Sequence, residues 1–65
     1  MAYPTVQERR RLCEAQVTLD ERPARISGWG LPFAQLSFRD GIGGVVEYAW
    51  ETVARIVANG GAFRS

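Results

Sequence analysis

Hydrophobic and polar residues alternate strictly from Cys13 to Leu19, with Ala15 and Val17 between them in the apolar row. Alternation with a period of two is typical of a strand that buries one face and leaves the other in water. We therefore predict a first strand over these residues. In that position Cys13, the single cysteine of the chain, is expected to be a small buried hydrophobe.

Three later segments also have the composition of strands: Ala24 to Trp29, Phe33 to Phe38 and Val45 to Ala49. Asp20-Glu21-Arg22-Pro23 separates the first two strands, because Asp begins turns and Pro cannot donate a ladder hydrogen bond. Gly30-Leu31-Pro32 breaks the chain again. Short connections join neighbouring antiparallel strands, so residues 12–49 are predicted to form a three- or four-stranded antiparallel meander.

From Trp50 onward the spacing of apolar residues lengthens to about 3.6, the period of an amphipathic helix. Val53 and Val57 continue this stripe, and Asn59-Gly60-Gly61 then supplies a stop signal. We predict a helix over residues 50–59 that packs on the buried face of the sheet, followed by a tail over 60–65. The fold class expected from the whole pattern is α+β.

The N-terminal residues carry a second, weaker helix signal. Thr5-Val6-Gln7-Glu8 has the spacing of a capping box, in which the Thr hydroxyl and the Glu carboxylate bind backbone N–H groups at a helix start. Arg10 interrupts the apolar stripe of such a helix. Residues 1–11 are therefore interpreted either as a short helix or as a mobile arm.

A single domain over residues 1–65 follows from the length of the chain, which is near the lower limit for a fold held by its core alone. A hydrophobic content of 46%, with seven aromatic residues, is too high for a disordered chain. A core this small favours association with a partner or with a second copy.

Charge excludes a strong overall attraction to nucleic acid or to a membrane, because the net charge is only +1. All eight basic residues are Arg, so any binding of this kind depends on how they are arranged locally. The chain has no apolar run long enough to cross a membrane. We expect a cytoplasmic protein.

The usual catalytic and metal-binding side chains are missing. Histidine is absent, so nothing would activate Cys13 or a serine, and no Cys or His pair is available for zinc. Asp40-Gly41-Ile42-Gly43-Gly44 resembles a phosphate loop in composition, but a strand and not a helix is expected after it. We therefore expect no enzyme activity, no cofactor and no metal.

The solvent-facing row of the predicted sheet holds the candidate binding residues. Trp29 and Phe33 flank the same tight connection, and Arg25 and Arg39 share their face. Exposed aromatic residues beside Arg are typical of protein interfaces, which indicates a non-catalytic interaction module that binds a protein partner or itself, including as a homodimer. The alternative is that Trp29 curls over the sheet edge or packs beneath the N-terminal segment.

Binding of single-stranded nucleic acid is the other function considered, because Arg and aromatic residues also contact phosphates and bases. The residues that would serve it are Arg9, Arg10, Arg11, Arg25 and Arg39. Acidic residues interleaved with them reduce the positive charge, and they include Glu14, Asp20 and Glu47.

Two stretches carry a resemblance to known sequences: Arg22-Pro23-Ala24-Arg25-Ile26 and the segment from Val46 to Ile56, Val-Glu-Tyr-Ala-Trp-Glu-Thr-Val-Ala-Arg-Ile. They are similar to parts of short uncharacterised bacterial proteins that have no assigned activity. This resemblance implies no catalytic or binding residue.

Overall fold

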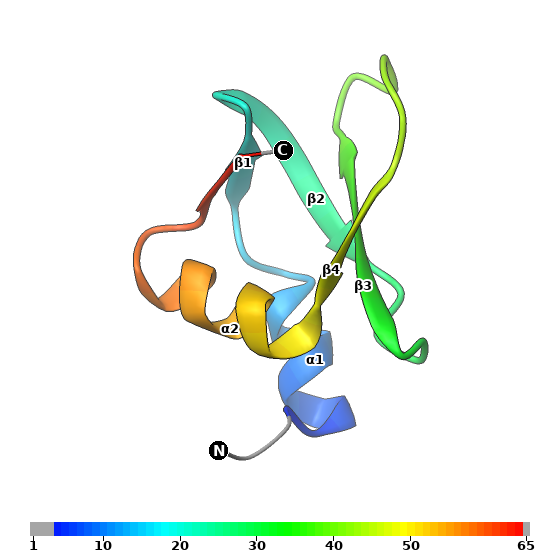
Figure 1. The fold of residues 1–65 in the computed structure, drawn as a ribbon, viewed down its shortest axis with the longest axis vertical. Coiled ribbons are helices and arrows are strands. Elements are labelled where there is room, and N and C mark those ends of the chain that lie inside the picture. The colour runs from blue at the N-terminus through cyan, green and yellow to red at the C-terminus, as the bar shows by residue number, and fades with distance from the viewer. Residues whose placement is uncertain (1–3, 65) are drawn as a thin grey trace.

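The computed structural model describes residues 4–64. Residues 1–3 of the predicted N-terminal arm and residue 65 of the predicted tail lie outside this range. The elements in chain order are α1 (Val6–Leu12), β1 (Val17–Leu19), β2 (Arg22–Ser27), β3 (Phe33–Phe38), β4 (Val46–Ala49), α2 (Trp50–Ala58) and β5 (Ala62–Phe63) (Figure 1). The expected α+β class is confirmed.

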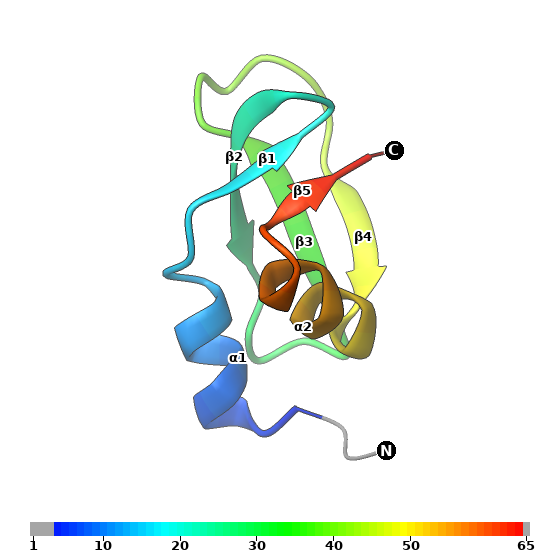
Figure 2. The same cartoon turned by 90° about the vertical axis from the view of Figure 1, so that its left-hand side faces the viewer.

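The sheet is five-stranded and mixed, with the order β4-β3-β2-β1-β5. Neighbours from β4 to β1 are antiparallel, whereas β5 runs parallel to β1, and Figure 2 shows these two strands side by side. The prediction of a three- or four-stranded antiparallel meander is therefore wrong. Ala62 and Phe63, assigned to the tail, form an edge strand that is too short to show any hydrophobic period.

The first strand is also shorter than predicted, because residues before Val17 belong to the end of α1 and to a turn. Cys13 is the C-cap of α1, and its N–H donates to the carbonyl of Arg9 at 3.0 Å. Its side chain is half-buried against the core. The alternation at 13–16 was misleading because apolar residues at a helix end can also pack inward.

The turn between β1 and β2 occupies two residues, Asp20 and Glu21, whose φ values are 53° and 67°. Positive φ at both central positions is the geometry of a tight hairpin turn that matches strand twist. Arg22 and Pro23, predicted to lie in the turn, are therefore the first residues of β2.

One buried cluster contains the inward side chains of β1, β2 and β3 together with two residues of α2 and one of β5. Its members are Val17, Leu19, Ala24, Ile26, Ala34, Leu36, Trp50, Val53 and Phe63. The members from β1, β2 and β3 alternate along their strands, and Trp50 and Val53 lie three residues apart on one side of α2. Phe63 has no such periodic pattern around it.

The two edge strands are linked through Tyr48 of β4. Its ring meets Phe63 of β5 edge to face, with centroids 5.2 Å apart, and its hydroxyl donates to the carbonyl of Arg64 at 2.8 Å. Burial raises the pKa of Tyr48, which keeps the hydroxyl a hydrogen-bond donor. This contact holds the two ends of the sheet toward each other.

Candidate interaction surface

The connection between β2 and β3 is held by hydrogen bonds to its backbone. The N–H of Leu31 donates to the carbonyl of Gly28 at 2.9 Å, and Nε1 of Trp50 donates to the carbonyl of Leu31 at 3.0 Å. The guanidinium of Arg9 donates to the carbonyl of Trp29 at 3.2 Å. Because Trp50 is fully buried, the loop is fixed to the core itself.

Three large apolar side chains project into solvent from this fixed connection and from the first residue of β3. Trp29 is 44% exposed, Leu31 45% and Phe33 52%. We call these three residues the apolar loop. Leu31 is not among the binding residues predicted from the sequence, although an apolar residue between Gly and Pro, outside any strand, indicates an exposed side chain.

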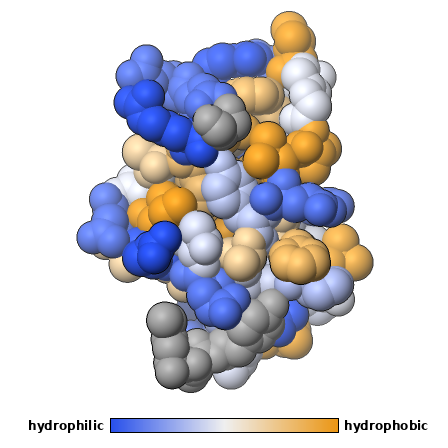
Figure 3. Space-filling view, in the orientation of Figure 1, coloured by the Kyte–Doolittle hydropathy of each residue, from blue (hydrophilic) through white to orange (hydrophobic). Residues whose placement is uncertain are grey.

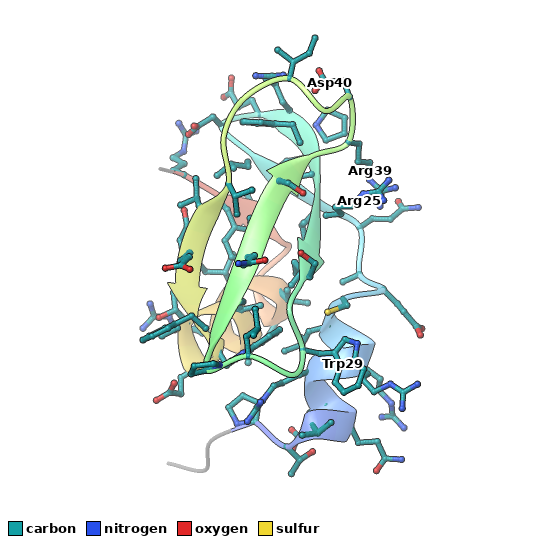
Figure 4. The ribbon with its side chains drawn as sticks, turned by 90° about the vertical axis from the view of Figure 1, so that its right-hand side faces the viewer. Arg25, Trp29, Arg39 and Asp40 are labelled. Atoms are coloured by element: carbon teal, nitrogen blue, oxygen red, sulfur yellow. The ribbon has the colours of Figure 1, made fainter. Side chains whose placement is uncertain are left out.

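Trp29 lies beyond the end of β2 and beside α1 (Figure 4). The guanidinium carbon of Arg10 stands 5.1 Å from the centre of its ring. Trp29 therefore lies beside α1 but is not packed beneath the N-terminal segment, and its exposure leaves it available for contact. A ring contact between Trp29 and Phe33 is absent from residues 4–64, where Tyr48 and Phe63 form the aromatic pair.

Arg25 and Arg39 come together on the outer side of the sheet, as Figure 4 shows. Both line one open hollow, which they share with Cys13, Glu14 and Ser27. The Nε of Arg39 donates to the carbonyl of Ala24 at 3.2 Å, which fixes the direction of its guanidinium. The two arginines therefore form a pair, at a distance from Phe33 along the sheet.

The run of three arginines in α1 does not act as one unit. Arg9 turns inward, with its Nε donating to the carbonyl of Pro4 at 3.1 Å and its guanidinium 5.8 Å from the Trp50 ring. Arg10 covers Trp29, and Arg11 is exposed. The five arginines considered for nucleic acid are thus divided between structural and surface roles.

Two ion pairs are present among residues 4–64, and both lie away from α1. Arg22 bonds Asp40 at 2.9 Å, and Arg64 is 3.5 Å from Glu21. The N–H of Ile42 and the guanidinium of Arg22 lower the pKa of Asp40, so this carboxylate stays charged.

The opposite end of the molecule has a smaller apolar tip. Ile42 is 68% exposed and Val45 59%, and both lie in the connection between β3 and β4. Figure 3 shows hydrophobic surface at this tip, and Figure 4 places the neighbouring Asp40 far from Trp29. Neither Ile42 nor Val45 is among the binding residues predicted from the sequence.

Within the described part of the chain, no group of three or more potential metal ligands is present, and no helix has the length and apolar character to span a bilayer. Burial raises the pKa of the Cys13 thiol, which disfavours the nucleophilic thiolate. Comparison with protein-family models, curated proteins and solved structures found no match.

Proposed function

We propose that this protein is a non-catalytic interaction module that binds a protein partner, or a second copy of itself, through the apolar loop. The observation that carries the proposal is that the apolar loop has exposed side chains on a fixed backbone. Nε1 of the buried Trp50 donates to the carbonyl of Leu31 and so holds that backbone in place. A surface that is ordered before binding loses little conformational entropy on association.

The residue types of the apolar loop support the same proposal. Trp and Arg are the residues that most often dominate the binding energy of protein interfaces, and Trp29 carries Arg10 on its ring. Full burial of an exposed Leu or Phe side chain contributes ~1.5–3 kcal/mol, and Leu31 and Phe33, which are about half exposed, can gain roughly half of that on binding. Three such side chains in one loop can anchor a partner.

The proposal depends on α2 filling the inner side of the sheet, so that the outer side is left for contact. Trp50 and Val53 support this arrangement, because both are fully buried in the cluster formed by the strands. The nucleic-acid alternative has less support, because Arg9 donates hydrogen bonds to the carbonyls of Pro4 and Trp29. Its guanidinium therefore has fewer donors left for a phosphate.

Sedimentation velocity over a range of concentrations tests self-association. If the partner is a second copy, the wild type forms dimers or larger species at high concentration, and Leu31→Ser remains monomeric. Ile42→Ser is the matched control, because it removes an even more exposed apolar side chain at the other end of the molecule.

Peptide selection from a random 12-residue display library tests binding to another protein. We expect the wild type to enrich a family of peptides with aliphatic or aromatic residues, whose binding is lost in Leu31→Ser and kept in Ile42→Ser. The proposal is contradicted if the wild type is monomeric and enriches no peptide family. It is also contradicted if the selected peptides bind Leu31→Ser as tightly as they bind the wild type.

A further inference from the structure

Four exposed arginines lie on α1 and on the part of the outer sheet face next to the end of α1. Arg10 stacks on Trp29, Arg11 is its neighbour in α1, and Arg25 and Arg39 line the hollow at the end of α1. We call these four residues the arginine face. Figure 4 shows Arg25, Arg39 and Trp29 along the same side.

No ion pair joins the arginine face to an acidic residue within the described residues, although the hydrogen bonds from Thr5 and the charge of Arg11 lower the pKa of Glu8. Both ion pairs there use other arginines, Arg22 and Arg64. Glu14 lines the hollow but forms no ion pair with Arg25 or Arg39. The carboxylate of Glu8, in the first turn of α1, is engaged by the N–H of Thr5. Positive charge therefore exceeds negative charge here, although the net charge of the chain is only +1.

We infer that the protein partner presents Asp or Glu side chains to the arginine face, next to aliphatic or aromatic residues that cover the apolar loop. This inference rests on the proposed function and adds the chemical class of the partner. An Arg guanidinium binds a carboxylate through two parallel hydrogen bonds, which gives orientation as well as attraction. Complementary charge also speeds association.

An acidic protein segment fits this surface better than the phosphates of a nucleic acid. Leu31 needs an aliphatic or aromatic group to cover it, and a sugar-phosphate backbone offers none. Arg10 also stands over the ring of Trp29, where a base would otherwise stack.

The experiment is the same selection from the random 12-residue library, repeated with a charge variant. Arg11→Gln combined with Arg25→Gln removes two charges that take part in no ion pair or side-chain hydrogen bond of the described structure. Arg55→Gln is the control, because Arg55 is an exposed arginine on α2. Circular dichroism establishes that each variant is folded.

We expect wild-type selection to enrich Asp and Glu together with apolar residues. A selected peptide should bind the double variant about fivefold more weakly and the control unchanged, and its affinity should fall with salt. Peptides that depend on Leu31 but show no acidic enrichment overturn this inference and leave the proposed function standing.

Two further probes separate carboxylate from phosphate. A single-stranded oligonucleotide of mixed sequence and vesicles of anionic phospholipid are titrated under the same conditions. If either binds more tightly than the selected peptides and loses affinity in the double variant, the arginine face is a phosphate site and the inference is wrong. Selection that enriches no peptides overturns this inference, and it also overturns the proposed function if the wild type is monomeric in sedimentation.

Discussion

Trp50 connects the core directly to the candidate binding surface. Its ring is fully buried, and its Nε1 bonds the carbonyl of Leu31, which lies in the apolar loop. One side chain therefore supports the packing of α2 and the position of the candidate binding residues.

Trp50→Phe should lower the free energy of unfolding by about 1–3 kcal/mol, because the carbonyl of Leu31 loses its buried donor and the smaller ring leaves space. Urea unfolding measures the change. Trp29→Phe is the control, since substitutions of exposed residues change stability by only about 0.5 kcal/mol. Equal stability of the two variants would contradict the anchoring role of Trp50.

Gly43 is a second position where one residue decides local structure. Its φ is +115°, and a Cβ added there would lie 2.9 Å from the ring of Phe38. Gly43→Ala should destabilise the protein by more than ~1 kcal/mol, whereas Gly44→Ala, with no atom within 4 Å, should have little effect. Thermal unfolding of the two variants distinguishes them, and similar melting temperatures would contradict the expected clash.

At the scale of elements, α1 depends on its first turn and not on an apolar stripe. Thr5 and Glu8 form a capping box, and α1 has no buried residue of its own. The sequence motif was sufficient to predict this helix start. It could not predict that Arg9 would bond the carbonyl of Trp29 and so attach α1 to the apolar loop.

The capping box predicts a pH dependence of stability. The N–H and hydroxyl of Thr5 lower the pKa of Glu8 below its ordinary value of 4.5 in the folded protein. The contribution of the Glu8 carboxylate to the stability of the fold is therefore complete above pH ~4.5. It is lost as the pH falls through the lower pKa that Glu8 has in the folded protein. Urea midpoints between pH 7 and pH 3 should fall less in Glu8→Gln than in the wild type.

Glu47→Gln is the matched control for this measurement, because Glu47 is an exposed carboxylate in β4 outside the capping box. If Glu8→Gln and wild type lose the same stability on acidification, the capping box does not contribute in solution. Helical content from circular dichroism should fall over the same pH range.

At the scale of the whole molecule, closure of the sheet depends on its last few residues. β5 pairs with β1, and Phe63 contacts Tyr48 of β4 at the other edge. The C-terminal segment thus joins both ends of the sheet, although only two of its residues are in a strand. A core of this size gives the fold only a small free energy of unfolding.

Phe63→Ala should therefore unfold most of the population at room temperature. Removal of a fully buried Phe costs about 3–5 kcal/mol, which is comparable with the stability of a small domain. Ala62→Ser, at the exposed neighbouring position, should stay folded. Near-ultraviolet circular dichroism checks both, and a folded Phe63→Ala variant would show that β5 is dispensable.

The sequence alone determined the local features of this protein. The α+β class, β3 over Phe33–Phe38, the start of α2 at Trp50 and the capping box at Thr5 all follow from patterns a few residues long. Periodicity and capping report local geometry, and local geometry was sufficient there.

Tertiary structure decided the rest, because those features depend on residues that are distant in the sequence. The parallel pairing of Ala62 and Phe63 with β1 has no local signal, since two residues cannot display a period. The sequence did not reveal that α1 ends at Cys13, because the alternation over residues 13–16 fits both a strand and the end of a helix. The anchoring of Leu31 by Trp50, on which the candidate surface depends, exists only in the folded chain.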